Sequence, residues 1–134
     1  MNKVQISIKS KNTTIESERY SKYVGTALDV DNGFTVLYTD EFGIPGKYII
    51  TQTSNLISIV NEIGSLKYQY SFNVVSVTSA TFIDVNKNKY SFSIKTKSLQ
   101  IFKHNLKISF DLYQEKFKND ITSYEITMEE KNEQ

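Results

Sequence analysis

Residues 106–114 read LKISFDLYQ, and this stretch decides the fold class. Its apolar side chains alternate with polar ones without a break, in the order Leu106, Lys107, Ile108, Ser109, Phe110, Asp111, Leu112 and Tyr113. Successive side chains of a strand point to opposite faces of a sheet, so this alternation predicts a half-buried β-strand.

The same two-residue period recurs along most of the chain, whereas helical periodicity is hard to find. The expected strands cover residues 3–10, 14–30, 34–40, 47–53, 56–63, 66–73, 81–85, 90–102, 106–114 and 121–128. The turns between them carry residues that tolerate positive φ, such as Asn32 and Gly33, and a loop at 41–46 contains Pro45. About eight to ten short strands joined by tight turns predict an all-β protein, a single antiparallel up-and-down barrel.

The expected strand 90–102 changes its pattern halfway. Phe92 and Ile94 place apolar side chains on even positions, and Leu99 and Ile101 place them on odd positions. One regular strand cannot bury both sets on the same face, which predicts a bulge or bend at residues 96–98. Gly25 is expected to mark a second bend or bulge, within the strand 14–30.

Length and composition limit the class of protein. A chain of 134 residues is expected to form one domain, residues 1–134, with a charged tail at 129–134 that frays. The chain has no cysteine, so neither a disulfide nor a Cys-based zinc site is expected. Val4, Ile6 and Ile8 alternate with polar residues, so no secretory signal or membrane span is expected, and we predict a soluble cytoplasmic protein.

Charge argues against two classes of partner. The formal net charge is +1 and Arg19 is the single arginine. Binding to nucleic acid or to an anionic membrane normally requires a basic surface, and base and phosphate recognition rely on arginine. We therefore expect neither nucleic acid nor membrane as a partner.

The order of strands resembles an uncharacterised bacterial group, the YwiB-like family. The stretches that carry the resemblance are VQISIKSK (4–11), FTVLYTDE (34–41), NEIGSLKYQYSF (61–72), FSIKTKSL (92–99), LKISFDLY (106–113) and SYEITM (123–128), with Ile15-Glu16 and Tyr23 between the first two. The chain departs from the family at GKYIITQTS (46–54), at Asn61–Ile63, and across 73–81. The resemblance implies a calycin-type, lipocalin-like barrel and no established activity.

Chemistry-bearing residues give weak signals. His104 is the single histidine and lies in an expected turn, where we interpret it as a solvated residue rather than a catalytic base. Asp40 and Glu41 are a candidate for cation binding, but neighbouring strand residues point to opposite faces. Asp29 and Asp31 begin like a calcium loop and lack its later ligands, so a hairpin is expected. No catalytic residue, metal or cofactor is assigned.

Three hypotheses for function remain open. The first is a non-enzymatic binding module that holds a small apolar ligand or a partner protein at the barrel mouth. Its expected lining combines apolar bulk with polar tips and consists of Tyr38, Tyr68, Tyr70, Phe92, Thr96 and Phe110. The second is a structural or regulatory protein with a solid core that binds a partner, or a second copy as a homodimer, through outward residues such as Leu37 and Tyr113. The third is an enzyme that uses His104 or a carboxylate.

Overall fold

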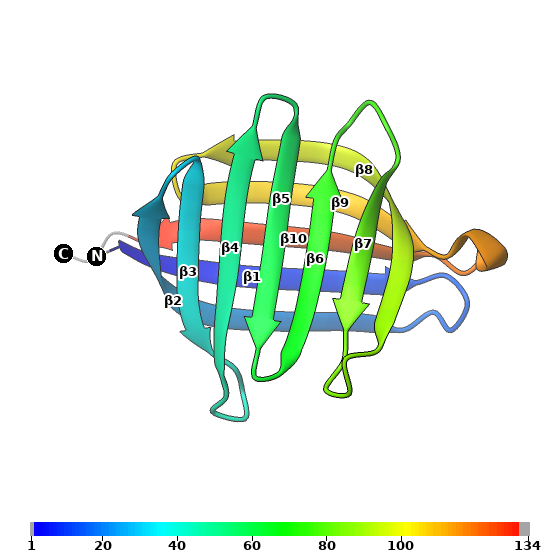
Figure 1. The fold of residues 1–134 in the computed structure, drawn as a ribbon, viewed down its shortest axis with the longest axis horizontal. Helices are drawn as coiled ribbons and strands as arrows, with labels where there is room; N and C mark the ends of the chain where they lie inside the picture. The colour runs from blue at the N-terminus through cyan, green and yellow to red at the C-terminus, as the bar shows by residue number, and fades with distance from the viewer. Residues whose placement is uncertain (1, 132–134) are drawn as a thin grey trace.

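The computed structural model describes residues 2–131, which form a closed barrel of ten antiparallel strands (Figure 1). Each strand pairs with the next along the chain, and β1 pairs with β10 to close the ring. The strands are β1 (Asn2–Asn12), β2 (Glu18–Val30), β3 (Gly33–Thr39), β4 (Pro45–Thr53), β5 (Leu56–Ile63), β6 (Leu66–Phe72), β7 (Thr78–Ile83), β8 (Lys89–Phe102), β9 (Asn105–Tyr113) and β10 (Thr122–Lys131). One 3-10 turn, η1 (Glu115–Phe117), precedes β10. The predicted up-and-down barrel is confirmed.

The barrel is flattened into two layers whose strands cross (Figure 1). β3 to β7 form one layer, and β1, β9 and β10 run across them in the other, while β2 and β8 pass from one layer to the other. β8 makes this passage at a bulge, because Thr96 pairs with Phe110 and Ser98 with Ser109, leaving Lys97 without an opposite residue. The bulge predicted from the change of pattern is therefore confirmed, and it lets Leu99 and Ile101 pack against the same core as Ile94.

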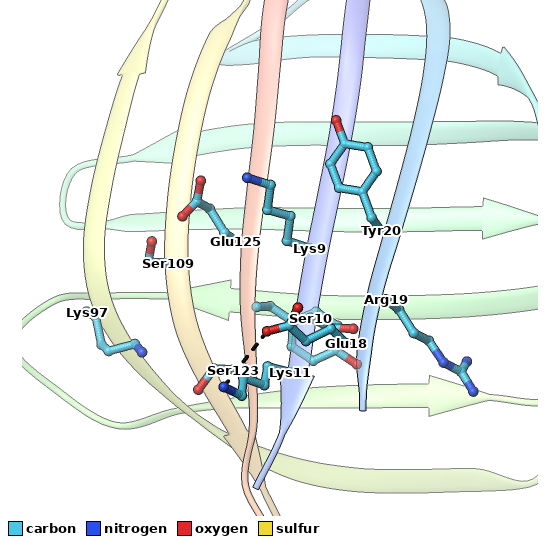
Figure 2. Close-up of a pocket in the computed structure, with 11 residues that line it drawn as sticks. Lys9, Ser10, Lys11, Glu18, Arg19, Tyr20, Lys97, Ser109, Ser123 and Glu125 are labelled. Atoms are coloured by element: carbon cyan, nitrogen blue, oxygen red, sulfur yellow. Dashed lines mark ion pairs between the residues drawn. The ribbon is translucent and has the colours of Figure 1, made fainter. Parts of the chain in front are cut away.

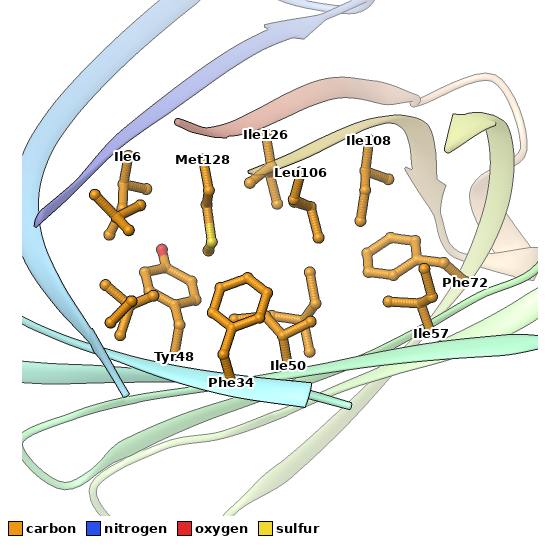
Figure 3. Close-up of a cluster of buried hydrophobic side chains, with 14 of the residues drawn as sticks. Ile6, Phe34, Tyr48, Ile50, Ile57, Phe72, Leu106, Ile108, Ile126 and Met128 are labelled. Carbon is orange, nitrogen blue, oxygen red and sulfur yellow. The ribbon is translucent and has the colours of Figure 1, made fainter. Parts of the chain in front are cut away.

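The space between the layers is filled by apolar side chains (Figure 3). Val4, Ile6, Ile50, Ile59, Ile94 and Ile108 are fully buried, as are Phe34, Phe72, Phe110 and Met128 to within two per cent. Each such side chain stabilises the fold by roughly 1.5–3 kcal/mol relative to an exposed one. The alternation seen in the sequence thus separates a packed interior from a polar outside.

Several expected boundaries are wrong, for local reasons. β2 begins at Glu18 rather than at residue 14, because Asn12 Oδ1 accepts hydrogen bonds from the backbone N–H groups of Thr14 and Ile15 and folds them into a turn. Pro45 belongs to β4 and not to a loop, since it pairs with Thr39 at the edge of the ladder. β7 starts three residues early, at Thr78, whose hydroxyl donates to the Ser71 carbonyl.

The expectation that the chain frays from residue 129 onward is also wrong for its first three residues. Glu129, Glu130 and Lys131 continue β10 and pair with Gln5, Val4 and Lys3 of β1. Pairing with the first strand closes the barrel, so the ends of the ladder are held by backbone hydrogen bonds despite their charge. The rest of the expected tail, residues 132–134, lies outside the described residues.

Candidate functional site

One edge of β2 lacks a partner strand over its first half. β1 pairs with β2 from Glu18 to Ala27, whereas the ladder to β3 starts only at Gly25, which lies opposite Tyr38. Within residues 2–131, no strand pairs with the other edge of residues 18–24. We call this edge, residues 18–24, the β2 seam. Its backbone groups form a template for another strand.

The chain leaves the seam after Thr39 because it turns back sharply. Asp40 Oδ1 accepts hydrogen bonds from the N–H groups of Phe42 and Ile44, each at 2.9 Å. Gly43 follows with a φ of 79°, a conformation that glycine adopts without strain. The turn sends the chain into β4, so that within residues 2–131 no strand continues the line of β3 beside residues 18–24.

Gly25 lies at the inner end of the seam. A Cβ atom there would lie 2.6 Å from Val36 Cγ1 and 2.7 Å from the Leu37 carbonyl oxygen. The glycine therefore lets β3 approach β2 closely at the point where their ladder begins. The bulge alternative at Gly25 is wrong, because neither the β1 ladder nor the β3 ladder, which begins at this residue, shifts its register. The bend alternative agrees with the course of β2, which passes from one layer to the other (Figure 1).

A groove of about 410 Å³ runs along the seam, lined by residues 20–24 of β2 and by residues 39–41. Tyr23 crosses it, since its hydroxyl donates to Glu41 Oε2 at 2.9 Å. Asp40 and Glu41 thus bind separate partners, a backbone turn and a phenol, and do not converge on a cation. Among the described residues, no group of three or more His, Asp or Glu side chains could hold a metal ion.

Behind the seam, tyrosine rings line the inside of the barrel. The tyrosine cluster comprises Tyr23, Tyr38, Tyr48, Tyr68, Tyr70 and Tyr124, contributed by β2, β3, β4, β6 and β10. Ring centroids are 5.3 Å apart for Tyr23 and Tyr38, 5.1 Å for Tyr38 and Tyr48, and 6.4 Å for Tyr68 and Tyr70. Phe110 connects Tyr70, at 6.0 Å, with Tyr124, at 5.2 Å.

The cluster changes from buried to open along its length. Tyr38 and Tyr48 are buried, whereas Tyr23, Tyr68, Tyr70 and Tyr124 are half-buried. Phe82 stacks on Tyr68 at 4.7 Å and continues the aromatic surface to Tyr90, which is 44% exposed. The cluster therefore forms a wall that is buried at one end and accessible at the other. We call this whole wall the tyrosine mouth.

Burial raises the pKa values of the phenols in the cluster. It raises the pKa of Tyr38 to about 12 and raises the pKa values of Tyr48 and Tyr70 further above their usual range. Burial also raises the pKa of Tyr124, and the nearby Arg19 guanidinium partly opposes this. Protonated phenols both donate and accept hydrogen bonds, so the mouth offers polar tips on an apolar wall.

Arg19, which the sequence analysis did not assign to a site, lies close enough to Tyr124 to affect its pKa. In Figure 2 its side chain extends past β2 on the side away from β1, that is, toward the seam. Together with Tyr124 it also lines an open groove of about 680 Å³ on the outer face of the layer that contains β1 and β10. That groove is rich in charge, and Figure 2 marks the ion pair between Lys11 and Glu18, whose atoms are 3.8 Å apart.

The structure brings four of the six expected lining residues together. Tyr38, Tyr68, Tyr70 and Phe110 belong to the tyrosine mouth or support it directly. The two others lie on β8, where Phe92 packs against the hydrophobic core and Thr96 is buried opposite Phe110. Phe92 lines a separate open depression of about 500 Å³ beside η1. Thr96 Oγ1 accepts the Asn73 N–H at 3.3 Å, which ties the loop after β6 to the bulge of β8.

Tyr23, Tyr48 and Tyr124 were missed at the sequence level. Each lies at a position with the inward parity of its strand, for example Tyr48 two residues before the buried Ile50. That parity was available as a signal. Which of the inward rings meet depends on pairing between strands, which the sequence does not show.

His104 is a clear correction, because it is buried and not a solvated turn residue. The residue is 7% exposed, and the centroid of its ring lies 5.1 Å from that of Phe34. Nε2 is 2.6 Å from Asp29 Oδ1, and Nδ1 is 3.3 Å from Asn2 Nδ2 and 3.5 Å from Glu130 Oε1. The imidazole thus joins the ends of β1, β2 and β10 to the turn between β8 and β9.

Comparisons with known proteins agree with the fold. No family model matches the chain, and no curated protein matches it. The crystal structure of the YwiB protein from Bacillus subtilis matches with a TM-score of 0.64 and 16% sequence identity, over 98% of this chain and 93% of that one. The likeness confirms the resemblance at the level of the barrel fold, while the calycin label stays a prediction. No helix within residues 2–131 is long and apolar enough to cross a membrane.

Proposed function

We propose that the protein is a binding module and that its site is the tyrosine mouth beside the β2 seam. The observation that carries this proposal is the half-burial of Tyr68, Tyr70 and Tyr124 on the inner side of the barrel, next to an edge with no strand over it. Inward aromatic residues of a closed, filled barrel are normally packed on all sides. Here the rings stay accessible, as the wall of a ligand site does.

The chemistry of the mouth favours a ligand group that is flat and apolar with a polar or anionic end. Stacked rings such as Tyr68 and Phe82 present their faces to an apolar or aromatic group. The phenols provide hydrogen-bond donors, and Arg19 places one positive charge at the rim. Asp40 and Glu41 place negative charge at the far end of the groove, so the site would orient a ligand whose two ends differ in charge.

The test uses 8-anilinonaphthalene-1-sulfonate (ANS), an aromatic anion whose fluorescence rises in apolar sites. We expect one saturable site in the folded protein and affinity lowered about tenfold in Tyr68→Leu, which removes a stacking surface worth about 1.4 kcal/mol. Tyr113→Leu is the matched control, because Tyr113 lies on β9 with the parity opposite to the buried Ile108 and Phe110 and lines neither the mouth nor the groove. A thermal unfolding curve checks that both variants are folded.

A second variant guards against a folding defect in the first. Tyr124→Leu alters the wall from the β10 side and is expected to weaken ANS binding as well. Non-saturable binding, or equal affinity in the wild type, Tyr68→Leu and Tyr124→Leu, would overturn the proposed function.

A further inference from the structure

Resting on the proposed function, we propose that the ligand of the tyrosine mouth is an extended segment of a partner protein, which adds as a strand to the β2 seam. The segment would run antiparallel to β2, in line with β3, and would cover the half-buried tyrosines. The proposal names the class of ligand: a peptide bound by its main chain, with apolar side chains on its inner face.

The first argument for a peptide ligand is that the backbone groups of the seam lack a partner strand. Every second residue of the seam directs its N–H and C=O away from β1, and among residues 2–131 no strand pairs with them. A segment that adds to such an edge forms a regular ladder, and its alternate side chains decide specificity. A small molecule would leave most of these groups without a protein partner.

β8, the other strand that passes between the two layers, provides a comparison for the edge of β2. β8 also crosses between layers, and there the loop after β6 lies against it, with Asn73 N–H bound to Thr96 Oγ1. At the seam the loop after β3 also makes a side-chain contact, since Glu41 accepts from the Tyr23 hydroxyl, but within residues 2–131 no loop backbone hydrogen-bonds to the backbone of residues 18–24. The main-chain groups of the seam therefore remain available to an added strand.

Space and shape agree with one added strand. The groove along residues 20–24 follows the line of β3 beyond Thr39. In the view of Figure 1 the lower ends of β4, β5, β6 and β7 extend beyond the line of β2. Tyr68 of β6 and Phe82 of β7 stack on each other, and we expect the inner face of the added strand to meet these two rings.

Side chains of the seam predict the composition of the segment. Glu18, Tyr20 and Lys22 point outward, because they alternate with the inward Tyr23 and its neighbours. An antiparallel partner then needs an acid opposite Lys22 and a base opposite Glu18, since opposite charges on facing residues attract. Its inward residues would be apolar opposite Tyr23 and Ser21, and aromatic opposite Arg19.

These rules define a probe peptide, acetyl-VEFTFK-amide, in which the residues V, E, F, T, F and K lie opposite residues 23 to 18 in that order. Titration of ¹⁵N-labelled protein is expected to shift the amide signals of residues 18–24, with a dissociation constant of about 10–100 µM. The same peptide is expected to displace ANS. A control peptide with the E and K exchanged is expected to bind several-fold more weakly.

Two N-methylated forms of the probe test the main-chain ladder. One carries methyl groups on the amides of V and both F residues, and the other on the amides of E, T and K. A strand next to β2 donates hydrogen bonds to it from only one of these sets, so one form is expected to lose binding and the other to keep it. Side chains are identical in both forms.

The outcomes separate this inference from the proposed function. If ANS binds at the mouth but the probe fails to bind, or if both methylated forms bind as well as the parent, the peptide inference is overturned and the binding module stands. If ANS also fails to bind at one saturable site, the proposed function itself is overturned. Sedimentation of the free protein as a dimer, with protection of the amides of residues 18–24, would assign the seam to a second copy and also overturn the inference.

Discussion

The imidazole of His104 lies 2.6 Å from the carboxylate of Asp29, although the ring is buried and the carboxylate side chain is 82% exposed. The two residues are separated by 75 positions, and their contact joins the end of β2 to the turn between β8 and β9. The buried partner and the exposed partner should therefore contribute very differently to stability.

His104→Ala is expected to lower the free energy of unfolding by about 2–3 kcal/mol, because it opens a cavity beside Phe34 and removes the polar partner of Glu130. Asp29→Asn is expected to cost less than about 1 kcal/mol, since exposed ion pairs contribute little. Urea unfolding followed by far-ultraviolet circular dichroism measures both. Equal losses in the two variants would show that the buried ring does not support this end of the barrel.

Tyr38 links stability to alkaline pH. Its hydroxyl accepts from Asn61 Nδ2 at 2.8 Å, and burial raises its pKa to about 12 from 10 in an unfolded chain. The folded state holds the proton more tightly, so this contribution is complete below pH 10 and is lost as the pH rises through 12. Tyr38→Phe is expected to flatten the fall in unfolding free energy across that window, which urea unfolding at several pH values between 10 and 12 measures.

Gly25→Ala tests the close approach of β2 and β3. The new methyl group would press on Val36 and on the Leu37 carbonyl, and we expect a loss of about 3 kcal/mol from overpacking. Gly43→Ala is the control, because no atom lies within 4 Å of its Cβ position and only its φ of 79° is unfavourable. That substitution is expected to cost about 1 kcal/mol. A smaller loss for Gly25→Ala than for Gly43→Ala in thermal unfolding would contradict the packing at the seam.

Deletion of Lys97 tests the bulge in β8, where that strand passes between the layers. The deletion pairs Thr96 and the following residue with β9 in one regular ladder, and it removes the extra residue that bends β8 between the layers. We expect a loss of about 2 kcal/mol or more, by analogy with other changes that force packed backbone to shift. Lys97→Ala keeps the bulge and loses the partly exposed ion pair between Lys97 Nζ and Asp111 Oδ1, so it is expected to cost under about 1 kcal/mol. Chemical unfolding compares the two directly.

Much of the barrel could be predicted because its signals are local. Alternation along residues 106–114 marked an amphipathic strand, and Asn32 adopts a φ of 64° at the turn where the sequence predicted a hairpin. The change of parity after Ile94 located the bulge for the same reason, since side chains on one strand must keep to one face. The predicted strand boundaries were wrong where a side chain hydrogen-bonds to backbone groups, as Asn12 does in the turn before β2.

The candidate site could be predicted only in part. Tyr68 and Tyr70 were recognisable as an aromatic stripe on one strand, and the stripe does face inward. Tyr124 and Arg19 join it from strands that lie far away in the sequence, through the pairing of β1 with both β2 and β10. His104 was misread because a turn residue is normally solvated, and its burial depends on Asn2 and Asp29 folding over it.

The sequence by itself determined which side chains point into the barrel and which point out, because the period of two is a property of each strand's own backbone. Only the tertiary structure decided where the wall remains open. The β2 seam exists because β1 pairs with β2 from residue 18 while β3 joins it only at Gly25, and both limits are set by partners distant in the chain. The half-buried tyrosines of the cluster lie toward this opening, whereas Tyr38 and Tyr48, within the β3–β4 ladder, are core.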